Sequence, residues 1–262
     1  MVLLKSKQMN KSREKGNIMI PYVRRQSILS ELEKHEIAYV NDLSEALNIS
    51  ASTIRRDLNT MAEEGEIVLL RGGAVKLREG SFDLSIQAKQ HLNMDKKERI
   101  AKHAASLVND GEVIYIDSGT TPLAMMKYLK NKQITVVTSN TQIIETLSDS
   151  EVQCIILGGE ITKNIGSIVG PITEKLLQNM FFDKSFLGAS GYSLLGGINT
   201  PDVREATKKD LVRINSKQTY VLVDSSKADK TTFYKAFNLD ECIIITDESN
   251  ELLEKYAKFM IA

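Results

Sequence analysis

Short apolar runs recur from residue 113 onwards and alternate with stretches of helical character. Each run is nearly continuous, which is typical of strands that are buried on both faces of a parallel sheet. Alternation of such strands with helices predicts an α/β domain whose sheet is mostly parallel. The runs are VIYI, ITVVT, VQCIIL, KSFLGA, TYVLV and ECIIIT.

The first part of the chain follows a different pattern. Apolar residues with helical spacing occur near residues 28–32, 40–47 and 54–61, which predicts three short helices. After them, IVLL and AVKL flank RGG, whose adjacent Gly72 and Gly73 can adopt the positive φ that a tight turn requires. We therefore expect a small helical domain that ends in a β-hairpin.

Composition places the domain boundaries. Residues 1–18 are polar, basic and aperiodic, and a helical pattern begins at Met19. This extension is either a disordered arm that touches DNA phosphates or sequence upstream of a native start at Met19. Residues 79–94 are charged and irregular, so we expect a linker there, between a domain at 19–78 and a second domain at 95–262. A chain of 262 residues can bury a core in each domain.

Charge and cysteine content limit the classes of function. Lysine and arginine together number 34, as do aspartate and glutamate, so a nucleic-acid site must be local rather than a property of the whole surface. Cys154 and Cys242 lie in apolar runs without metal-ligand spacing, which indicates buried thiols in a reducing compartment. No segment approaches the roughly 18 apolar residues of a membrane span. We expect a cytoplasmic protein with no metal site and no cofactor.

The stretch LNISASTIRRDLNTM carries the first functional signal. Asn48 tolerates the left-handed backbone of a sharp turn, and Ser50 is a good N-cap for the helix that follows. That helix would bury one apolar face and direct hydroxyls and two arginines outward, as reading a DNA major groove requires. The alternative is a solvated face on which Asp57 neutralises Arg55 and Arg56. Agreement of the turn, the cap and the following hairpin favours DNA reading.

A second signal is DSGTT, which follows the strand VIYI. We expect the strand to end near Asp117 and a helix to begin at Pro122, a residue suited to the first helical position. The hydroxyls and amides between them, backed by the helix dipole, would form a neutral cradle for a phosphate, and Gly119 would allow close approach of the backbone. The alternative is an ordinary strand-to-helix turn, in which glycine and hydroxyl residues are common.

Polar clusters follow other predicted strands in the same way. They are Ser139 and Asn140, then Gly158, Gly159 and Glu160, and then residues 224–227. Ligands of open α/β sheets bind outside the carboxyl ends of the strands, so we expect these clusters and DSGTT to form one pocket.

Charged residues near these clusters could complete the pocket. Lys227 would supply a cation for the phosphate, with Asp224 orienting it. Glu205 and Lys208, spaced i to i+3 on a predicted helix, could reach sugar hydroxyls, or they could form a surface ion pair of small energetic value. The candidate ligand-binding residues are Ser118, Gly119, Thr120, Thr121, Ser139, Asn140, Gly158, Gly159, Glu205, Lys208, Asp224 and Lys227.

These motifs together resemble a known family. IPYVRRQSILSEL, LSEALNISASTIRRDLNTM and GEIVLLRGGAV resemble the winged helix-turn-helix of DeoR-family bacterial transcriptional regulators, and the likeness continues through DSGTT, TSN, LGGE and DSSK over residues 19–262. Ser44 and Asn48 stand where the family commonly has alanine and glycine. The resemblance implies that the helix with residues 52–56 enters the major groove and that the hairpin flanks the DNA. It gives these DNA-contact candidates: Ser50, Ser52, Thr53, Arg55, Arg56 and Arg71.

The second domain is similar, through the same family, to ribose-5-phosphate isomerase and to CoA-transferase-like folds. Those isomerases combine a phosphate loop with an acidic segment of the form DGADE and a nearby lysine. Here the matching segment is LGAS, residues 187–190, and the lysine position falls in SLLGG. Enediol chemistry needs a positioned acid and base, so the resemblance implies binding without turnover, and we expect that the protein is not an enzyme.

The resemblance implies a repressor of a sugar or sugar-alcohol catabolic operon. A phosphorylated sugar or sugar alcohol would bind the second domain and release the protein from double-stranded operator DNA. We expect a homo-oligomer, a dimer or a tetramer, because paired half-sites need at least two reading helices. Two alternatives remain at this point: an active sugar-phosphate isomerase fused to a DNA-binding domain, and an architectural DNA-bending protein with a degenerate sensor.

Overall fold

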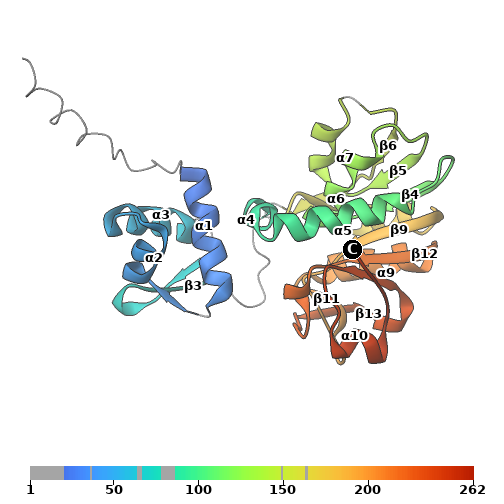
Figure 1. Cartoon of the computed structure of the whole chain (residues 1–262). Coiled ribbons are helices and arrows are strands. Elements are labelled where there is room, and N and C mark those ends of the chain that lie inside the picture. Colours follow the sequence, from blue (N-terminus) through green and yellow to red (C-terminus); the bar gives the residue numbers. More distant parts are fainter. Residues whose placement is uncertain (1–20, 36, 64–66, 78–85, 149, 163–164) are drawn as a thin grey trace, which may run out of the picture. The chain divides into compact units, whose positions relative to one another are not determined.

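The computed structural model describes residues 21–35, 37–63, 67–77, 86–148, 150–162 and 165–262 (Figure 1). The chain divides into two compact units, Met1–Leu77 and Arg78–Ala262. The extension expected at residues 1–18 lies outside the described residues. Of the helices in those ranges, none has the length and apolar character needed to cross a membrane.

The first unit contains helices followed by a hairpin, as the sequence predicts. The turn of the hairpin passes through Gly72 and Gly73, whose φ values are 79° and 77°. A short strand β1 adds to the hairpin to give the antiparallel sheet order β1-β3-β2, which the sequence did not reveal. The elements are α1 (Pro21–Lys34), β1 (Ala38–Tyr39), α2 (Val40–Leu47), α3 (Ala51–Glu63), β2 (Ile67–Leu69), η1 (Arg71–Gly73) and β3 (Ala74–Leu77).

The turn between α2 and α3 has the predicted geometry. Asn48 has a left-handed backbone with φ 52°, and its N–H donates to the carbonyl of Glu45. The Ser50 hydroxyl accepts a hydrogen bond from the Thr53 N–H at 3.3 Å, which is the N-cap contact. The apolar face of α3 is buried: Ile54, Leu58 and Met61 are at most 1 % exposed.

Asp57 has a role that the sequence did not predict. It is only 7 % exposed and forms a two-pronged ion pair with Arg24 of α1, whose Nη2 lies 2.9 Å from Asp57 Oδ1. The pair joins α1 to α3 inside the unit. Asp57 is therefore not the surface counter-charge of Arg55 and Arg56, because its carboxylate faces the core rather than solvent.

The second unit is built on a seven-stranded sheet in the order β15-β14-β12-β9-β4-β5-β6. Every neighbouring pair is parallel, which confirms the predicted fold class. The final strand, β15, is an addition to the expected set. The strands are β4 (Val113–Ile116), β5 (Thr135–Thr138), β6 (Gln153–Ile156), β9 (Phe182–Gly188), β12 (Ser216–Leu222), β14 (Ile243–Thr246) and β15 (Lys258–Ile261).

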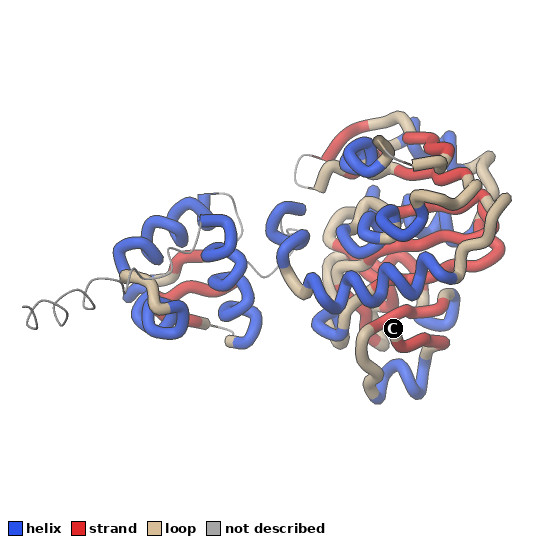
Figure 2. The backbone as a smooth tube through the Cα atoms, turned by 45° about the horizontal axis from the view of Figure 1, so that its top comes forward, coloured by secondary structure: helices blue, strands red, loops and turns tan. Residues whose placement is uncertain are grey.

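Helices cover both faces of this sheet, as Figure 2 shows. Successive side chains of a strand point to opposite faces, so Ile114 and Ile116 of β4 enter one apolar cluster while Tyr115 enters the other. The first cluster also includes residues of α5 (Met94–Ser106) and α7 (Met126–Leu129). The second includes residues of α8 (Pro171–Leu177), α9 (Val203–Ile214) and α10 (Glu251–Tyr256). Burial on both faces explains the continuous apolar runs.

Smaller elements lie around the sheet. The stretch TQIIET after β5 forms a 3₁₀ turn. Cys242 is buried as expected, but Cys154 is only half-buried because β6 is an edge strand. The elements are η2 (Thr141–Thr146), β7 (Glu160–Thr162), β8 (Ser167–Val169), β10 (Gly191–Ser193), β11 (Gly197–Thr200), η3 (Ser225–Lys227), β13 (Tyr234–Phe237) and η4 (Leu239–Glu241).

The structure differs from the expected linker over its second half. Residues 78–85 lie outside the described residues, but Ile86–His91 form helix α4, and Asn93 precedes α5 within the second unit. Ile86 is 4 % exposed. The helix was not recognised because six residues make less than two turns, too few for a helical period to appear in the sequence.

Candidate functional site

The exposed face of α3 carries the residues expected to contact DNA. Ser52, Arg55 and Arg56 are exposed, and Thr53 is half-buried. The Ser50 hydroxyl lies 3.1 Å from Ser52 Oγ and 2.9 Å from Thr53 Oγ1, so three hydroxyls gather at the start of the helix. Arg55 and Arg56 form no ion pair with any described residue. Their guanidinium groups can therefore meet an anionic partner.

Arg71 is the remaining candidate of the first unit. It is exposed and begins the turn between β2 and β3, where Gly72 and Gly73 reverse the chain. The structure thus brings five of the six candidates to the start of α3 and carries Arg71 on the hairpin.

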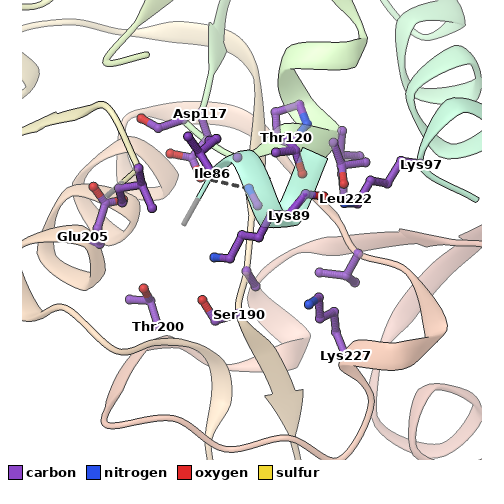
Figure 3. Close-up of a pocket in the computed structure, with 18 of the residues that line it drawn as sticks. Ile86, Lys89, Lys97, Asp117, Thr120, Ser190, Thr200, Glu205, Leu222 and Lys227 are labelled. Atoms are coloured by element: carbon purple, nitrogen blue, oxygen red, sulfur yellow. Dashed lines mark hydrogen bonds between the residues drawn. The ribbon is translucent and has the colours of Figure 1, made fainter. Parts of the chain in front are cut away.

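A pocket opens at the carboxyl ends of β4, β9 and β12, in the middle of the seven-stranded sheet (Figure 3). The DSGTT loop forms one wall, and α9 contributes Glu205 and Lys209. The end of β11 contributes Thr200, and the segment after β12 contributes Asp224 and Lys227. The sequence therefore placed the pocket at the correct edge of the sheet.

The helix after DSGTT begins earlier than predicted. Helix α6 spans Thr120–Ala124 with Gly119 as its N-cap, so Pro122 is the third helical residue rather than the first. Proline is tolerated there because the first N–H groups of a helix have no acceptor within it. A Cβ on Gly119 would lie 3.1 Å from Pro122 Cδ and 3.5 Å from Gly188 Cα, so glycine allows the close approach of two loops.

Several pocket groups have no polar partner among the described residues. The hydroxyls of Thr120, Thr121 and Thr200 form no hydrogen bond there, although Thr121 is 6 % and Thr200 3 % exposed. Lys227 forms no ion pair there either, and its side chain is half-buried. Three hydroxyls and one ammonium group thus line the pocket and can form hydrogen bonds with a ligand.

Ser118 lines the pocket but is committed to an internal network. Its hydroxyl lies 2.9 Å from Ser139 Oγ and 2.7 Å from Ser167 Oγ. Lys208, 1 % exposed, donates to the same two hydroxyls at 2.9 and 2.6 Å and to Glu205 Oε1 at 2.8 Å. Ser139 and Lys208 therefore lie behind the pocket wall. Lys208 is neither a sugar contact nor half of a surface ion pair, because its helix position faces the sheet.

Asp117 is the polar centre of the pocket wall. Its Oδ2 accepts a hydrogen bond from the Gly188 N–H at 2.9 Å and forms an ion pair with the Lys209 ammonium. The same ammonium lies 3.6 Å from Glu205 Oε2. Its Oδ1 has no hydrogen-bond partner among the described residues. Burial alone would raise the pKa of Asp117, but the ammonium groups of Lys209 and Lys208 outweigh burial and lower that pKa. An ionised carboxylate with one unoccupied oxygen therefore borders the pocket.

Sequence reasoning missed Asp117 and Lys209 as site residues. In the sequence, Asp117 marks only the expected end of a strand, and nothing there distinguishes Lys209 from its neighbour Lys208. The pair itself was a usable signal, because consecutive helical residues point about 100° apart and one can face the pocket when the other faces the sheet.

Of the remaining candidates, Asp224 lines the pocket, whereas Asn140, Gly158 and Gly159 do not. Asn140 is buried and caps η2 by accepting the Gln142 N–H at 2.9 Å, and Asp224 accepts the Ser226 N–H at 3.0 Å and an Asn93 hydrogen bond at 3.2 Å. Asp224 lines the pocket but forms no ion pair with Lys227. Gly158 and Gly159 follow β6, two strands away from β4, and do not line the pocket.

Comparisons with known proteins match both units. Residues 24–79 match the model of the DeoR-like helix-turn-helix domain, and residues 92–248 match that of the DeoR C terminal sensor domain. The chain is 37 % identical to the uncharacterized HTH-type transcriptional regulator FruR of Bacillus subtilis, over 89 % of this chain and 94 % of that protein. It is 29 % identical to the lactose phosphotransferase system repressor of Staphylococcus epidermidis, over 90 % and 96 %.

A solved structure is similar to part of the chain. Ribose 5-phosphate isomerase A of Methanocaldococcus jannaschii is 22 % identical with a TM-score of 0.39, over 52 % of this chain and 55 % of that protein.

Proposed function

The chain belongs to the DeoR family of HTH-type transcriptional regulators, and from this we propose that it is a repressor that a phosphorylated sugar or sugar alcohol releases from operator DNA. Regulation of a carbohydrate operon is consistent with the name of its lactose phosphotransferase system relative. Two questions follow: how the first unit reads DNA, and what the pocket binds.

For DNA reading, the exposed face of α3 supports the proposal. Arg55 and Arg56 have no ion-pair partner among the described residues, so contact with DNA breaks no such internal bond. Arginine can bond two acceptors of a guanine edge at once, and the hydroxyls at the start of α3 suit phosphate oxygens. We assign base reading to the arginines and phosphate contacts to Ser50, Ser52 and Thr53, with Arg71 beside them on the hairpin.

For the effector, the observation that carries the proposal is the set of unpartnered polar groups in a pocket this buried. Leaving one buried polar group unsatisfied costs about 1 to 3 kcal/mol, so a ligand that satisfies several of them gains affinity. Asp117 Oδ1 is such a group. The hydroxyls of Thr121 and Thr200, which form no hydrogen bond with the described residues, are further groups that a ligand can engage. Their chemistry therefore describes the ligand.

The charge distribution makes the pocket two-sided. Asp117 is an ionised acceptor, which attracts a hydroxyl donor and repels a phosphate. Lys227, from the segment after β12, is a cation that suits a phosphate. The hydroxyls of Thr120 and Thr121, at the far end of the DSGTT loop from Asp117, can donate to the same phosphate. A molecule with a hydroxyl-rich body and a terminal phosphate satisfies both ends. This is the class of sugar and sugar-alcohol phosphates.

Binding without turnover fits the same contacts. Glu205 accepts hydrogen bonds from Ser167 at 2.6 Å and from Lys208 at 2.8 Å. Both donors reach Oε1, so these contacts position Glu205, but the acidic segment of the isomerases is replaced by LGAS at residues 187–190. Enediol chemistry needs an acid as well as a base, and this segment supplies no second carboxylate. We therefore favour a sensor over an active isomerase.

Release from DNA requires the effector to favour a state that binds DNA less well. A coupling free energy of about 1 to 3 kcal/mol would weaken operator binding roughly 5- to 150-fold, and operator DNA would weaken effector binding by the same factor. Operators with paired half-sites need two reading helices, so we include a homo-oligomer in the proposal.

The test is a ligand screen on the full chain. The panel contains ribose 5-phosphate, glucose 6-phosphate, fructose 1-phosphate and sorbitol 6-phosphate, each with its unphosphorylated parent, and inorganic phosphate alone. Ligand at about 100 times its dissociation constant should add roughly 2.7 kcal/mol to the free energy of unfolding. Stabilisation by a phosphorylated compound and not by its parent supports the proposal. Equal effects of both members of every pair would contradict it.

A further inference from the structure

Helix α4 lies outside the residues matched by either family model, which end at 79 and resume at 92. It nevertheless forms part of the pocket through Ile86 and Lys89. In Figure 3 the Lys89 side chain extends from α4 into the pocket, toward the side on which Ser190, Thr200 and Glu205 lie. A segment that the sequence assigned to the linker thus brings an ammonium group to the ligand site.

The contacts of α4 connect it to the pocket itself. Lys97 of α5, which also lines the pocket and is 8 % exposed, donates to the main-chain carbonyl of Lys89. Gln90 donates to Gln142 Oε1 at 3.2 Å, and Ile86 is almost fully buried. A helix of six residues is unstable alone, so these tertiary contacts determine its position.

We propose that Lys89 binds the phosphate of the effector together with Lys227, and that the bound effector thereby holds α4 on the sensor. This inference rests on the proposed function, because it assigns a further contact to the same ligand. Lys89 approaches from α4 and Lys227 from the segment after β12, so a phosphate between them joins two separate elements. Ammonium groups suit a phosphate as point charges that need no fixed planar geometry.

The position of α4 in the chain gives this contact a regulatory meaning. Only eight residues, 78–85, separate Ile86 from Leu77 at the end of the DNA-binding unit. α4 is therefore the first described element of the sensor after that unit. A ligand that fixes α4 also fixes the point at which the DNA-binding unit is attached to the sensor. Coupling between two sites requires a contact that the ligand makes in one state of the protein and not in the other, and the contact with α4 is of this kind.

The test compares full-length variants in ligand titrations followed by calorimetry. Lys89→Gln and Lys227→Gln each remove one proposed phosphate contact, Lys89→Arg keeps the charge, and Lys102→Gln removes an exposed lysine of α5 as a matched control. The probe is the phosphorylated compound of the panel that stabilises the wild type most. We expect the dissociation constant to rise about tenfold, which corresponds to about 1.4 kcal/mol, in both glutamine variants of the pocket. Lys89→Arg should retain most of the affinity.

A second measurement follows α4 directly. Amide hydrogen exchange in residues 86–92 should slow at least tenfold when the probe binds the wild type, and this protection should be lost in Lys89→Gln. Melting temperatures without ligand identify any variant that is misfolded, and Lys89→Arg then provides the comparison.

The outcomes separate this inference from the proposed function. If Lys227→Gln weakens the probe but Lys89→Gln binds it as the wild type does, Lys89 is not an effector residue and the inference is overturned. Unchanged exchange in residues 86–92 on binding would overturn the role of α4. If no phosphorylated compound of the panel binds the wild type, the proposed function fails and this inference fails with it.

Discussion

Replacement of Lys209 by methionine tests the charge arrangement at the pocket wall. The Lys209 ammonium pairs with Asp117 and lies 3.6 Å from Glu205 Oε2, and Asp117 is only 1 % exposed. Lys209→Met keeps the apolar stem and removes the charge, so the Asp117 carboxylate retains the Gly188 N–H but loses its ion pair. Breaking a buried pair by removing one partner costs about 3 to 5 kcal/mol, because the other charge remains uncompensated.

The size of the effect follows from the size of the domain. In a domain of this length, 1 kcal/mol shifts the melting temperature by about 2 to 4 °C, so Lys209→Met should lower it by about 6 to 20 °C. Calorimetry and urea unfolding of the full chain measure the change in the free energy of unfolding. Lys102→Met, at an exposed position of α5, is the matched control and should stay within about 0.5 kcal/mol of the wild type.

The double variant Asp117→Asn/Lys209→Met tells a charge effect from a packing effect. It removes both charges and should be more stable than Lys209→Met alone, because no unpaired carboxylate is left. The ion pair does not stabilise the pocket wall if Lys209→Met and Lys102→Met have the same free energy of unfolding. The same conclusion follows if the effects of the two substitutions in the double variant are additive. The reasoning about Asp117 would then be refuted.

Three further predictions concern other parts of the molecule. Arg56→Ala should weaken operator binding by about 1 to 3 kcal/mol if the arginine reads a base, or flatten the salt dependence if it contacts phosphate; unchanged affinity and salt slope in fluorescence anisotropy would remove it from the interface. The pKa of Asp117 is lower in the folded protein than the ordinary aspartate pKa of about 4, so ionised Asp117 stabilises the fold above that ordinary pKa. This stability is lost as pH falls through the folded-state pKa. Urea midpoints should therefore drop at acidic pH, and Asp117→Asn should make the midpoint less dependent on pH. Gly197→Ala should be severely destabilising, because φ is 54° and the new Cβ would lie 2.2 Å from the Phe237 carbonyl, whereas Gly111→Ala, with open space around it, should cost only the backbone strain of about 1 kcal/mol; equal melting temperatures would contradict the close approach.

The sequence predicted the two folds well, because each rests on local patterns. Runs such as VIYI identify strands that are buried on both faces, and Asn48 with Ser50 identifies the turn and cap between α2 and α3. Strand order is different, because it depends on pairing between distant segments. For this reason the sequence does not show that Gly158 and Gly159 lie apart from the pocket, after β6, which is two strands from β4.

The pocket chemistry was only partly predictable. The sequence identified the hydroxyls of DSGTT and Lys227, which line the pocket. It did not show that Lys208 faces the sheet while Lys209 faces Asp117, since the packing of α9 decides which lysine is inside. Helix α4 was missed for another reason: it is short, and tertiary contacts rather than its own periodicity determine its position.

The central claim is that occupancy of the pocket weakens the hold of the protein on DNA. Its most direct measurement is operator affinity by fluorescence anisotropy, with and without a saturating concentration of the phosphorylated compound that stabilises the full chain most. The account predicts that the dissociation constant for the operator rises by roughly 5- to 150-fold, and that the unphosphorylated parent compound leaves it unchanged. An operator affinity that stays constant while the compound is bound would contradict it.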